Sequence, residues 1–313
     1  TIFSCPKPFR GHINIIQRNA IKSWTLLEPR PEIILIGDEE GTAEVCQEFG
    51  LRHVPEVKRN EYGTPLLNSI FDEAQAVAQY PLMSYVNSDI ILTSDFMRAV
   101  KQVVKEIGDK FLLIGRRWDV ELDKPWEFSL PDWESKLRTY ARKHGAIGHI
   151  CAMDFFVFPK GLWDTIPPFA LGRLSWDHWL VYKALMMGIP VIDGTAAVTA
   201  VHQCHDYSHL PKIQSNLLKS AEVKRNLELW GGPVQVMTVW DATHVLHREG
   251  LRKASFMRHA GAKLTKLRNS LKLRAIKASD DTNVYSYFWI VLDKAITRCL
   301  KIFRPFIGMA RRP

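Results

Sequence analysis

Short apolar runs alternate with segments of helical periodicity along the front of the chain. Five runs predict strands, at residues 1–5, 32–37, 51–57, 82–87 and 111–115. Between them, apolar residues recur at three- and four-residue spacing and predict helices, at residues 13–27, 42–50, 67–78 and 96–107. Strands that alternate with helices are typical of an α/β fold, with a mainly parallel sheet and helices on both faces.

Polar residues follow several of these strands directly. Because ligands bind beyond the carboxyl ends of parallel strands, we expect residues 5–9, 38–39, 87–89 and 116–117 to lie on one rim of the sheet. The triplet Asn87-Ser88-Asp89 stands out because an apolar run resumes directly after it. A carboxylate at a strand end suits Mg²⁺ or Mn²⁺, although Asn and Asp are also common turn residues. The triplet is therefore a candidate metal site, with a simple turn as the alternative.

The charge of the chain is divided unevenly. Residues 211–313 contain 20 Lys/Arg and 7 Asp/Glu, a net charge of +13, whereas residues 1–210 contain 22 and 26. We expect a catalytic or binding domain at residues 1–210 and a basic, mainly helical C-terminal region at residues 211–313. The basic region suits an anionic membrane surface, and the alternative is a solvated helical face. Nucleic acid is disfavoured as a partner because the chain has no helix-turn-helix, RNP or zinc-finger pattern.

The composition indicates a globular protein. The chain has 313 residues, of which 46% are hydrophobic, enough to bury a sizeable core. Its apolar runs are shorter than the roughly 20 residues that a spanning helix needs, and we find no signal-peptide pattern. Five scattered cysteines without a CxxC pair favour reduced thiols. We therefore predict a cytoplasmic protein that binds the inner membrane face peripherally through its basic region.

Seven motifs carry a resemblance to a known family. They are TIFSCPKPF, EIILIGDEEG, RNEYGTPLLNSIFDEA, YVNSDIIL, AMDFFVFP, WDHWLVYKALMMGIPVID and VHQCHDYSH. In this order they resemble the nucleotide-diphospho-sugar glycosyltransferases of the A-type fold, bacterial members in particular, over roughly residues 1–210. The resemblance implies a single Rossmann-like, mixed and mainly parallel sheet. It also implies a nucleoside-diphosphate sugar donor, a glycan or glycolipid acceptor, and Mn²⁺ or Mg²⁺ as cofactor.

The resemblance also implies where a metal ion binds. The family carries Asp-x-Asp at the end of its fourth strand, and the last acid binds the metal that bridges the donor phosphates. Here Asn87 replaces the first acid, which leaves Asp89 as the expected ligand. A segment after the last sheet strand often folds over the diphosphate in this family, and the cluster of His202, His205 and His209 lies in such a segment. We expect His205 first, and His209 second, to complete the site.

The expected catalytic base is Asp177. In inverting members an acid at the start of the corresponding helix deprotonates the acceptor hydroxyl, and a carboxylate suits this role because it only has to accept a proton. The alternative is a helix cap, since Asp177 stands just before the apolar positions of a predicted helix. Asp154, at the start of the strand FFVFP, is expected to bind hydroxyls of the transferred sugar, with a turn acid as its alternative.

The remaining expected contacts surround the donor. The residues expected to bind the nucleotide sugar are Pro6, Lys7, Asp38, Glu39, Arg59, Asn68, Asn87, Ser88, Asp154 and Trp176. We predict an inverting glycosyltransferase. Two alternatives stay open: a degenerate, non-catalytic protein that binds membrane or polyanion, and a sugar-phosphate nucleotidyltransferase. The second lacks support because the segment CPKPFRGH is not the Gly-rich start of that class.

Overall fold

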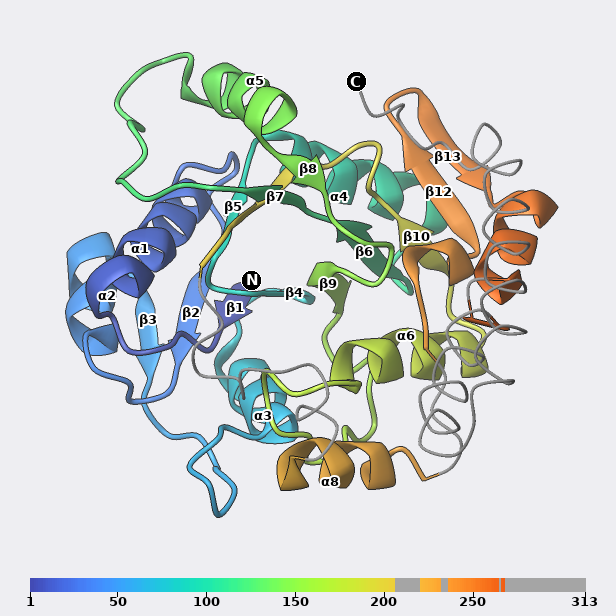
Figure 1. Ribbon diagram of the computed structural model, residues 1–313, viewed down its shortest axis with the longest axis horizontal. Helices are drawn as coiled ribbons and strands as arrows, with labels where there is room; N and C mark the ends of the chain where they lie inside the picture. The colour runs from blue at the N-terminus through green and yellow to red at the C-terminus, as the bar shows by residue number, and fades with distance from the viewer. Residues whose placement is uncertain (206–219, 232–235, 265, 268–313) are drawn as a thin grey trace, which may run out of the picture.

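The computed structural model describes residues 1–205, 220–231, 236–264 and 266–267 (Figure 1). The strands are β1 Ile2–Ser4, β2 Ile33–Ile36, β3 Arg52–Val54, β4 Leu82–Val86, β5 Ile90–Leu92, β6 Leu112–Arg116, β7 Trp118–Val120, β8 Ala146–Ile147, β9 Met153–Pro159, β10 Val191–Asp193, β11 Ala200–Gln203, β12 His244–His247 and β13 Gly250–Lys253. The helices are α1 Gly11–Thr25, α2 Thr42–Phe49, α3 Leu67–Val77, α4 Asp95–Ile107, α5 Trp133–His144, α6 Trp176–Met186, α8 Ala221–Leu229 and the short 3₁₀ helix η1 Val239–Asp241. Residues 256–264 are also helical.

The larger sheet has nine strands in the order β13-β12-β10-β6-β9-β4-β1-β2-β3. Neighbouring strands pair in parallel from β3 to β4 and again from β6 to β12. Strand β9 runs antiparallel between β4 and β6, and β13 is an antiparallel edge. The predicted mixed, mainly parallel sheet is thus confirmed.

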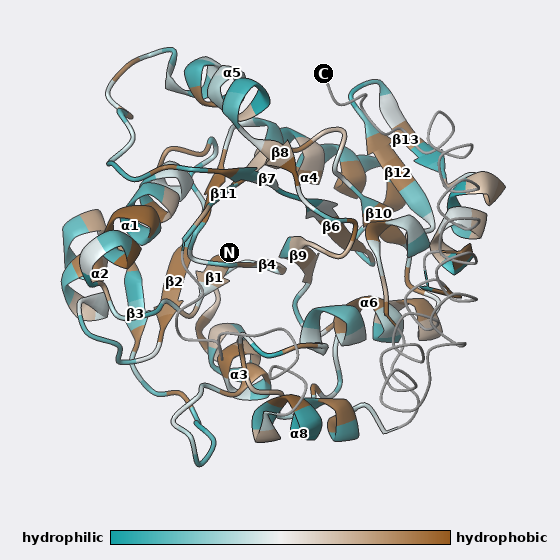
Figure 2. Ribbon diagram, in the orientation of Figure 1, coloured by the Kyte–Doolittle hydropathy of each residue, from teal (hydrophilic) through white to brown (hydrophobic). Residues whose placement is uncertain are grey.

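Helices cover both faces of this sheet because its strands are buried on both sides. Successive residues of β1 enter different cores: Ile2 packs in the core beneath α1 and α4, and Phe3 packs in the core beneath α3 and α6. Strand β2 alternates in the same way. Figure 2 shows these central strands as apolar elements between helices with one apolar side. The predicted helical periodicities are therefore the packed faces of α1, α2, α3 and α4.

A second sheet of four strands, in the order β5-β11-β7-β8, stands beside the first. It packs against α5 through a separate small core that includes Val120, Leu137 and Val201. This sheet explains the run YVNSDIIL. The apolar residues before the triplet belong to β4 of the large sheet, and those after it belong to β5 of the small one. Residues 87–89 are the polar passage between the two sheets.

The sheet continues past residue 210, the predicted domain boundary. Strand β12 pairs in parallel with β10, and β13 completes a hairpin with β12. Behind this hairpin, Arg258 forms a buried ion pair with Asp193 at the end of β10. The described part of the basic region is therefore partly built into the sheet. Residues 268–313 of the predicted basic region lie outside the described residues.

None of the helices in the described part of the chain is both long enough and apolar enough to span a bilayer.

Candidate functional site

The polar residues that follow the strands meet at one edge of the large sheet. Strands β1, β2, β4 and β6 share one direction, so their carboxyl ends lie at the same edge. Strand β9 runs the other way and therefore brings its first residues, with Asp154, to that edge. The rim expected from the sequence is present, and it is the candidate site.

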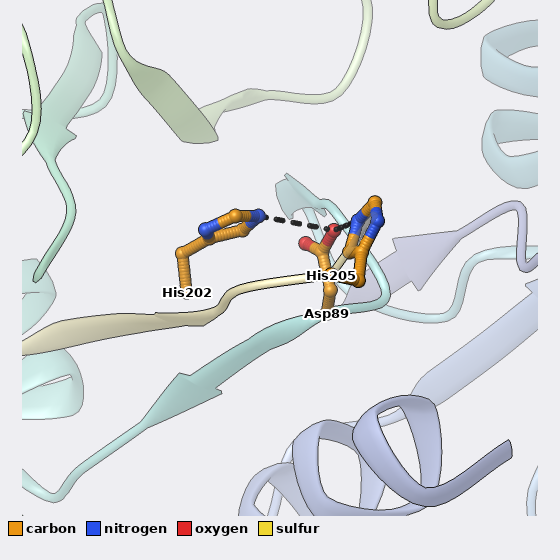
Figure 3. Close-up of side chains that lie close together, drawn as sticks. All are labelled: Asp89, His202 and His205. Atoms are coloured by element: carbon orange, nitrogen blue, oxygen red, sulfur yellow. Dashed lines mark hydrogen bonds and ion pairs between the residues drawn. The ribbon is translucent and has the colours of Figure 1, made fainter. Parts of the chain in front are cut away.

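Asp89 lies at this rim between two histidines (Figure 3). The Oδ2 of Asp89 lies 3.6 Å from the Nε2 of His202 and 3.3 Å from the Nε2 of His205. The pairing of β5 with β11 makes this possible because it places His202 opposite Ile90, the residue after Asp89. The other carboxylate oxygen of Asp89, Oδ1, is buried and has no hydrogen-bond partner among the described residues. Asp89 and His205 meet as expected, whereas His209 lies outside the described residues.

These three side chains fit a divalent cation. Each offers one ligand atom, and the three atoms lie within 4.8 Å of one another. Burial acts to raise the pKa of Asp89, but hydrogen bonds to His202 and His205 outweigh it and lower that pKa, so the carboxylate is ionised. An oxygen and two imidazole nitrogens suit Mn²⁺ better than Mg²⁺, which prefers oxygen ligands throughout.

His202 connects this triad to a second carboxylate. Its Nδ1 lies 3.0 Å from the Oδ1 of Asp119, which follows β6 on strand β7. The side chain of His202 is only 3% exposed. Burial alone would lower the pKa of His202, yet its hydrogen bonds to Asp119 and Asp89 raise it to about 12. Without a metal His202 is therefore an imidazolium, and it would have to release its Nε2 proton to bind a cation. The carboxylate of Asp119 would then hold the remaining Nδ1 proton and fix the orientation of the ring.

A second network holds Asp154. The Nδ2 of Asn87 donates to the Oδ1 of Asp154 at 2.7 Å, and the Nη1 of Arg117 donates to both its oxygens at 2.9 Å. Arg117 also donates from Nε to Asp119 at 2.8 Å, which joins this network to that of His202. Burial raises the pKa of Asp154, although Arg117 opposes the shift. Asp154 is therefore a fixed, buried acceptor at the rim.

The loop after β1 is held close to the triad by Gln17 of α1. The side chain of Gln17 accepts from the backbone N–H of Lys7 at 2.7 Å and donates to its carbonyl at 2.8 Å. The same side chain accepts from the hydroxyl of Ser88 at 2.9 Å. The ammonium of Lys7 is near enough to contribute to the lowered pKa of Asp89. Pro6, next to Lys7, is buried.

The expected nucleoside contacts form a separate group at the end of β2. Arg59 pairs with Asp38 at 2.6 Å and with Glu39 at 2.8 Å, so the three expected side chains meet. Asn68, in the first turn of α3, has a buried Oδ1 without a partner. Trp176 is placed differently from the expectation. It is 6% exposed and packs its ring against Tyr85 and Phe156, which makes it part of the core under the site.

Asp177 is the second residue of α6 and is half-buried. Within the described residues its carboxylate makes no hydrogen bond or ion pair, so the capping contact considered as its alternative is not formed. The residue before α6, Ser175, has a φ of +91°. Burial raises the pKa of Cys151 to about 12, and the charge of Asp177 adds to this effect, so the two side chains are neighbours. Asp177 is thus a carboxylate at a helix start that no described residue binds.

Four residues of this site were not predicted from the sequence as binding or metal-ligating residues: His202, Asp119, Arg117 and Gln17. His202 and His205 are both part of the histidine cluster noted in the sequence, but only the β5–β11 pairing shows that His202 also faces Asp89. Arg117 was noted as a rim residue without a defined contact. Gln17 lies on the buried face of α1 and is 1% exposed. A buried polar side chain is nearly always hydrogen-bonded, so its place on an apolar helix face indicates a polar network there.

Neither the scan of protein-family models nor the search of curated proteins finds a match to this chain. Among solved structures, its fold is similar to glucosyl-3-phosphoglycerate synthase of Mycobacterium tuberculosis. The complex of that enzyme with phosphoglyceric acid matches with a TM-score of 0.45 and 13% identity, over 74% of this chain and 80% of that one. Its complex with Mn²⁺, uridine-diphosphate-glucose and glycerol 3-phosphate gives 0.44 and 14% over the same shares. At this identity the likeness extends to the fold alone.

Proposed function

We propose that this protein is a glycosyltransferase that moves a sugar from a nucleoside-diphosphate sugar to an acceptor hydroxyl with inversion. One observation carries the proposal: an ionised Asp89, flanked by two imidazoles, has a buried oxygen at the carboxyl edge of the sheet that no described residue binds. Asp89, His202 and His205 would hold Mn²⁺, or less favourably Mg²⁺. When bound, the cation supplies positive charge for the two phosphates of the donor and stabilises the leaving diphosphate.

The donor lies along the rim from β2 to β9 in this proposal. Asp38, Glu39 and Arg59 bind the nucleoside in this proposal, because they form a polar group at the far end of the rim. Asn68 joins them through its buried Oδ1, which has no partner among the described residues. Pro6, Lys7 and Ser88 shape the wall beside the diphosphate, with the ammonium of Lys7 contributing positive charge. Asp154, fixed by Asn87 and Arg117, accepts hydrogen bonds from hydroxyls of the transferred sugar.

Asp177 is the proposed general base. The acceptor hydroxyl oxygen forms a bond to the anomeric carbon, and the bond from that carbon to the phosphate oxygen breaks. The diphosphate leaves with the electron pair, and the hydroxyl proton passes to the carboxylate of Asp177. The free carboxylate of Asp177 supports this role, since no described side chain occupies its lone pairs.

Binding and calorimetry test the proposed donor site. Mn²⁺ with UDP or GDP should raise the melting temperature of the wild-type chain, and Asp89→Ala should remove this effect while the fold is kept. The control variant is Asp109→Ala, because Asp109 is exposed, and it should respond like wild type. Asp95 is unsuitable for this purpose because it accepts a hydrogen bond from Thr199. Unchanged metal-dependent UDP or GDP binding by Asp89→Ala contradicts the proposed site. Transfer of a nucleotidyl group to a sugar phosphate instead would favour the nucleotidyltransferase alternative.

Turnover tests the proposed base. Asp177→Asn keeps the size of the side chain and should lower kcat by roughly 10²-fold or more with the donor KM little changed. The product should carry the anomeric configuration opposite to that of the donor, as NMR of the product will show. Near-normal turnover by Asp177→Asn, or retention of configuration, excludes Asp177 as the base of an inverting transfer.

We further propose that the acceptor is a glycan or glycolipid at the cytoplasmic membrane face, with residues 211–313 in contact with anionic lipid. The net charge of +13 on that region supports it. Flotation with liposomes should recover the full chain with anionic lipid at low salt, and neutral liposomes should not. A chain cut near residue 210 is a poor test because it removes β12 and β13 from the sheet. A chain that ends at residue 267 keeps every described element and should lose most of the binding.

A further inference from the structure

The backbone turn directly before α6 is strained. Ser175 has a φ of +91°, and among the described residues it is the one non-glycine residue with a positive φ. This region is unfavourable for an L-residue other than glycine, so surrounding contacts must hold the turn in place. Asp177 lies two residues further along, in the first turn of the helix that Ser175 opens. The conformation of Ser175 therefore sets the direction in which the carboxylate of Asp177 points.

Two side chains at the C-terminal end of α8 bind this turn. The indole Nε1 of Trp230 donates to the carbonyl of Ser175 at 3.3 Å, and the Nδ2 of Asn226 donates to the carbonyl of Leu174 at 3.2 Å. Asn226 is fully buried and also exchanges two hydrogen bonds with the backbone of Ala170, at 2.8 and 3.1 Å. Both amide N–H groups of Asn226 and its carbonyl oxygen are thus engaged with residues 170–174.

The same two side chains are packed as well as hydrogen-bonded. The ring of Trp230 lies 5.3 Å from that of Tyr182, which is on α6 itself. Trp230 therefore touches α6 at two levels, at the strained residue before it and on its body. The backbone N–H of Trp179 binds the same carbonyl of Ser175, as the first hydrogen bond of the helix. The start of α6 is therefore held by Trp179, which belongs to the helix itself, and by Trp230, which follows α8.

Helix α8 also reaches the opposite side of the rim. Glu222, in its first turn, accepts from Asn60 at 2.8 Å and from Arg173 at 2.7 Å, and Arg225 pairs with Glu61 at 2.6 Å. Asn60 and Glu61 follow Arg59 directly in the chain. Helix α8 thus ties the loop that carries Arg59 to the turn that precedes Asp177, and Figure 1 shows α8 lying beside α3 and α6.

We infer that Asn226 and Trp230 are positioning residues for Asp177, and that α8, from the region predicted to meet membrane, is part of the catalytic domain. The inference rests on the proposed function, because it concerns the orientation of the proposed base. Trp230 and Asn226 do not touch the reacting atoms. They hold a strained turn whose relaxation would rotate the first turn of α6.

Trp230→Phe tests the inference because it removes the indole N–H and keeps an aromatic ring against Tyr182. We expect roughly tenfold lower kcat with an unchanged donor KM, since a misplaced catalytic group lowers turnover without weakening donor binding. In the Asp177→Asn background the same change should have no further effect, because the group that it positions is no longer a base. Equal losses in both backgrounds would mean that Trp230 acts on overall structure only.

The matched control is Trp126→Phe. Trp126 packs against the separate small core beside α5, and among the described residues its indole N–H has no hydrogen-bond partner, so the same substitution removes no contact to the turn or to α6. It should leave kcat at the wild-type value. A loss of kcat equal to that of Trp230→Phe overturns the inference.

Hydrogen exchange tests the clamp independently of turnover. Trp230→Phe should speed amide exchange at residues 174–180, and Trp126→Phe should not. Unchanged exchange at these residues overturns the inference even if the enzyme is active. A wild-type chain that transfers no sugar overturns the proposed function, and the exchange measurement then still decides whether α8 holds the turn.

Discussion

The Nδ2 of Asn87 donates a hydrogen bond of 2.7 Å to the Oδ1 of Asp154. This contact explains why the chain carries Asn at the first position of the Asp-x-Asp pattern. The carboxylate of Asp154 is 5% exposed and already close to the charge of Asp89, so a second acid at position 87 would face a buried like charge. The amide of Asn87 offers a donor instead. Asn87 thus holds the proposed sugar-binding acid, and Asp89 is left as the proposed metal ligand.

Restoring the acid should therefore destabilise the protein. Asn87→Asp places two carboxylates at hydrogen-bond distance, and we expect a loss of about 1–3 kcal/mol in the free energy of unfolding. The loss should be smaller at acidic pH, where the pair can share a proton. Urea denaturation measures it. The control is Asn14→Asp, where the new carboxylate would face the Nε of Arg18 instead, now 2.8 Å from the Oδ1 of Asn14. Equal stability of Asn87→Asp and wild type would falsify this account.

Asp119 should matter for metal affinity although it lies outside the triad. Its Oδ1 holds the Nδ1 of His202 at 3.0 Å, which turns the Nε2 toward Asp89. Asp119→Asn should weaken Mn²⁺ binding by roughly 10–100-fold, as replacing the partner of a metal-binding histidine commonly does. Calorimetric titration with Mn²⁺ alone measures this without turnover. The exposed Asp123→Asn, four residues away, should bind Mn²⁺ as wild type does. Wild-type affinity in Asp119→Asn would show that the ring of His202 is fixed by other contacts.

Arg258 should behave as a structural residue in spite of its place in the basic region. Its guanidinium is buried against Asp193 and donates to the carbonyl of Val239 at 2.9 Å. Arg258→Ala leaves Asp193 buried without its ion-pair partner, which should cost about 3–5 kcal/mol. Lys263→Ala, at an exposed position of the same helical segment, should change stability by less than about 0.5 kcal/mol. Thermal unfolding of both variants compares them directly, and similar melting temperatures would contradict the assignment.

Glu222 should make the docking of α8 sensitive to acid. Burial acts to raise the pKa of Glu222, but hydrogen bonds from Thr64, Asn60 and Arg173 outweigh it, so that pKa is lowered from its usual value of 4.5. A carboxyl whose pKa is lowered by folding stabilises the native state above that value and stops doing so as the pH falls through its folded pKa. The wild type should therefore lose stability in acid more steeply than Glu222→Gln. Parallel stability curves for the two proteins between neutral pH and pH of about 3 would contradict this.

The local elements follow from the sequence alone. The spacing of apolar residues predicts which face of a strand or helix is buried, because backbone geometry fixes the direction of each side chain. Ile2 and Phe3, for example, alternate between two cores. The shared rim follows as well, since parallel strands bring their carboxyl ends to one edge. Asp89, Lys7 and the pair Asp38-Glu39 could therefore be placed at the rim before any contact was known, whereas Arg59 was expected there only from the family resemblance.

The partners across the fold were decided by tertiary structure. Asp89 and His205 are 116 residues apart, and the pairing of β5 with β11 that joins them leaves no periodic trace in the sequence. The burial of Arg258 could not be predicted from the sequence either. The net charge of a region does not show which of its basic residues faces a buried carboxylate. Spacing along the chain determines which side of an element is buried. Packing and charge pairing in three dimensions decide which distant segment covers that side. The contacts of His202, of Asp154 and of the turn before Asp177 all depend on such pairing, so the tertiary structure alone reveals them.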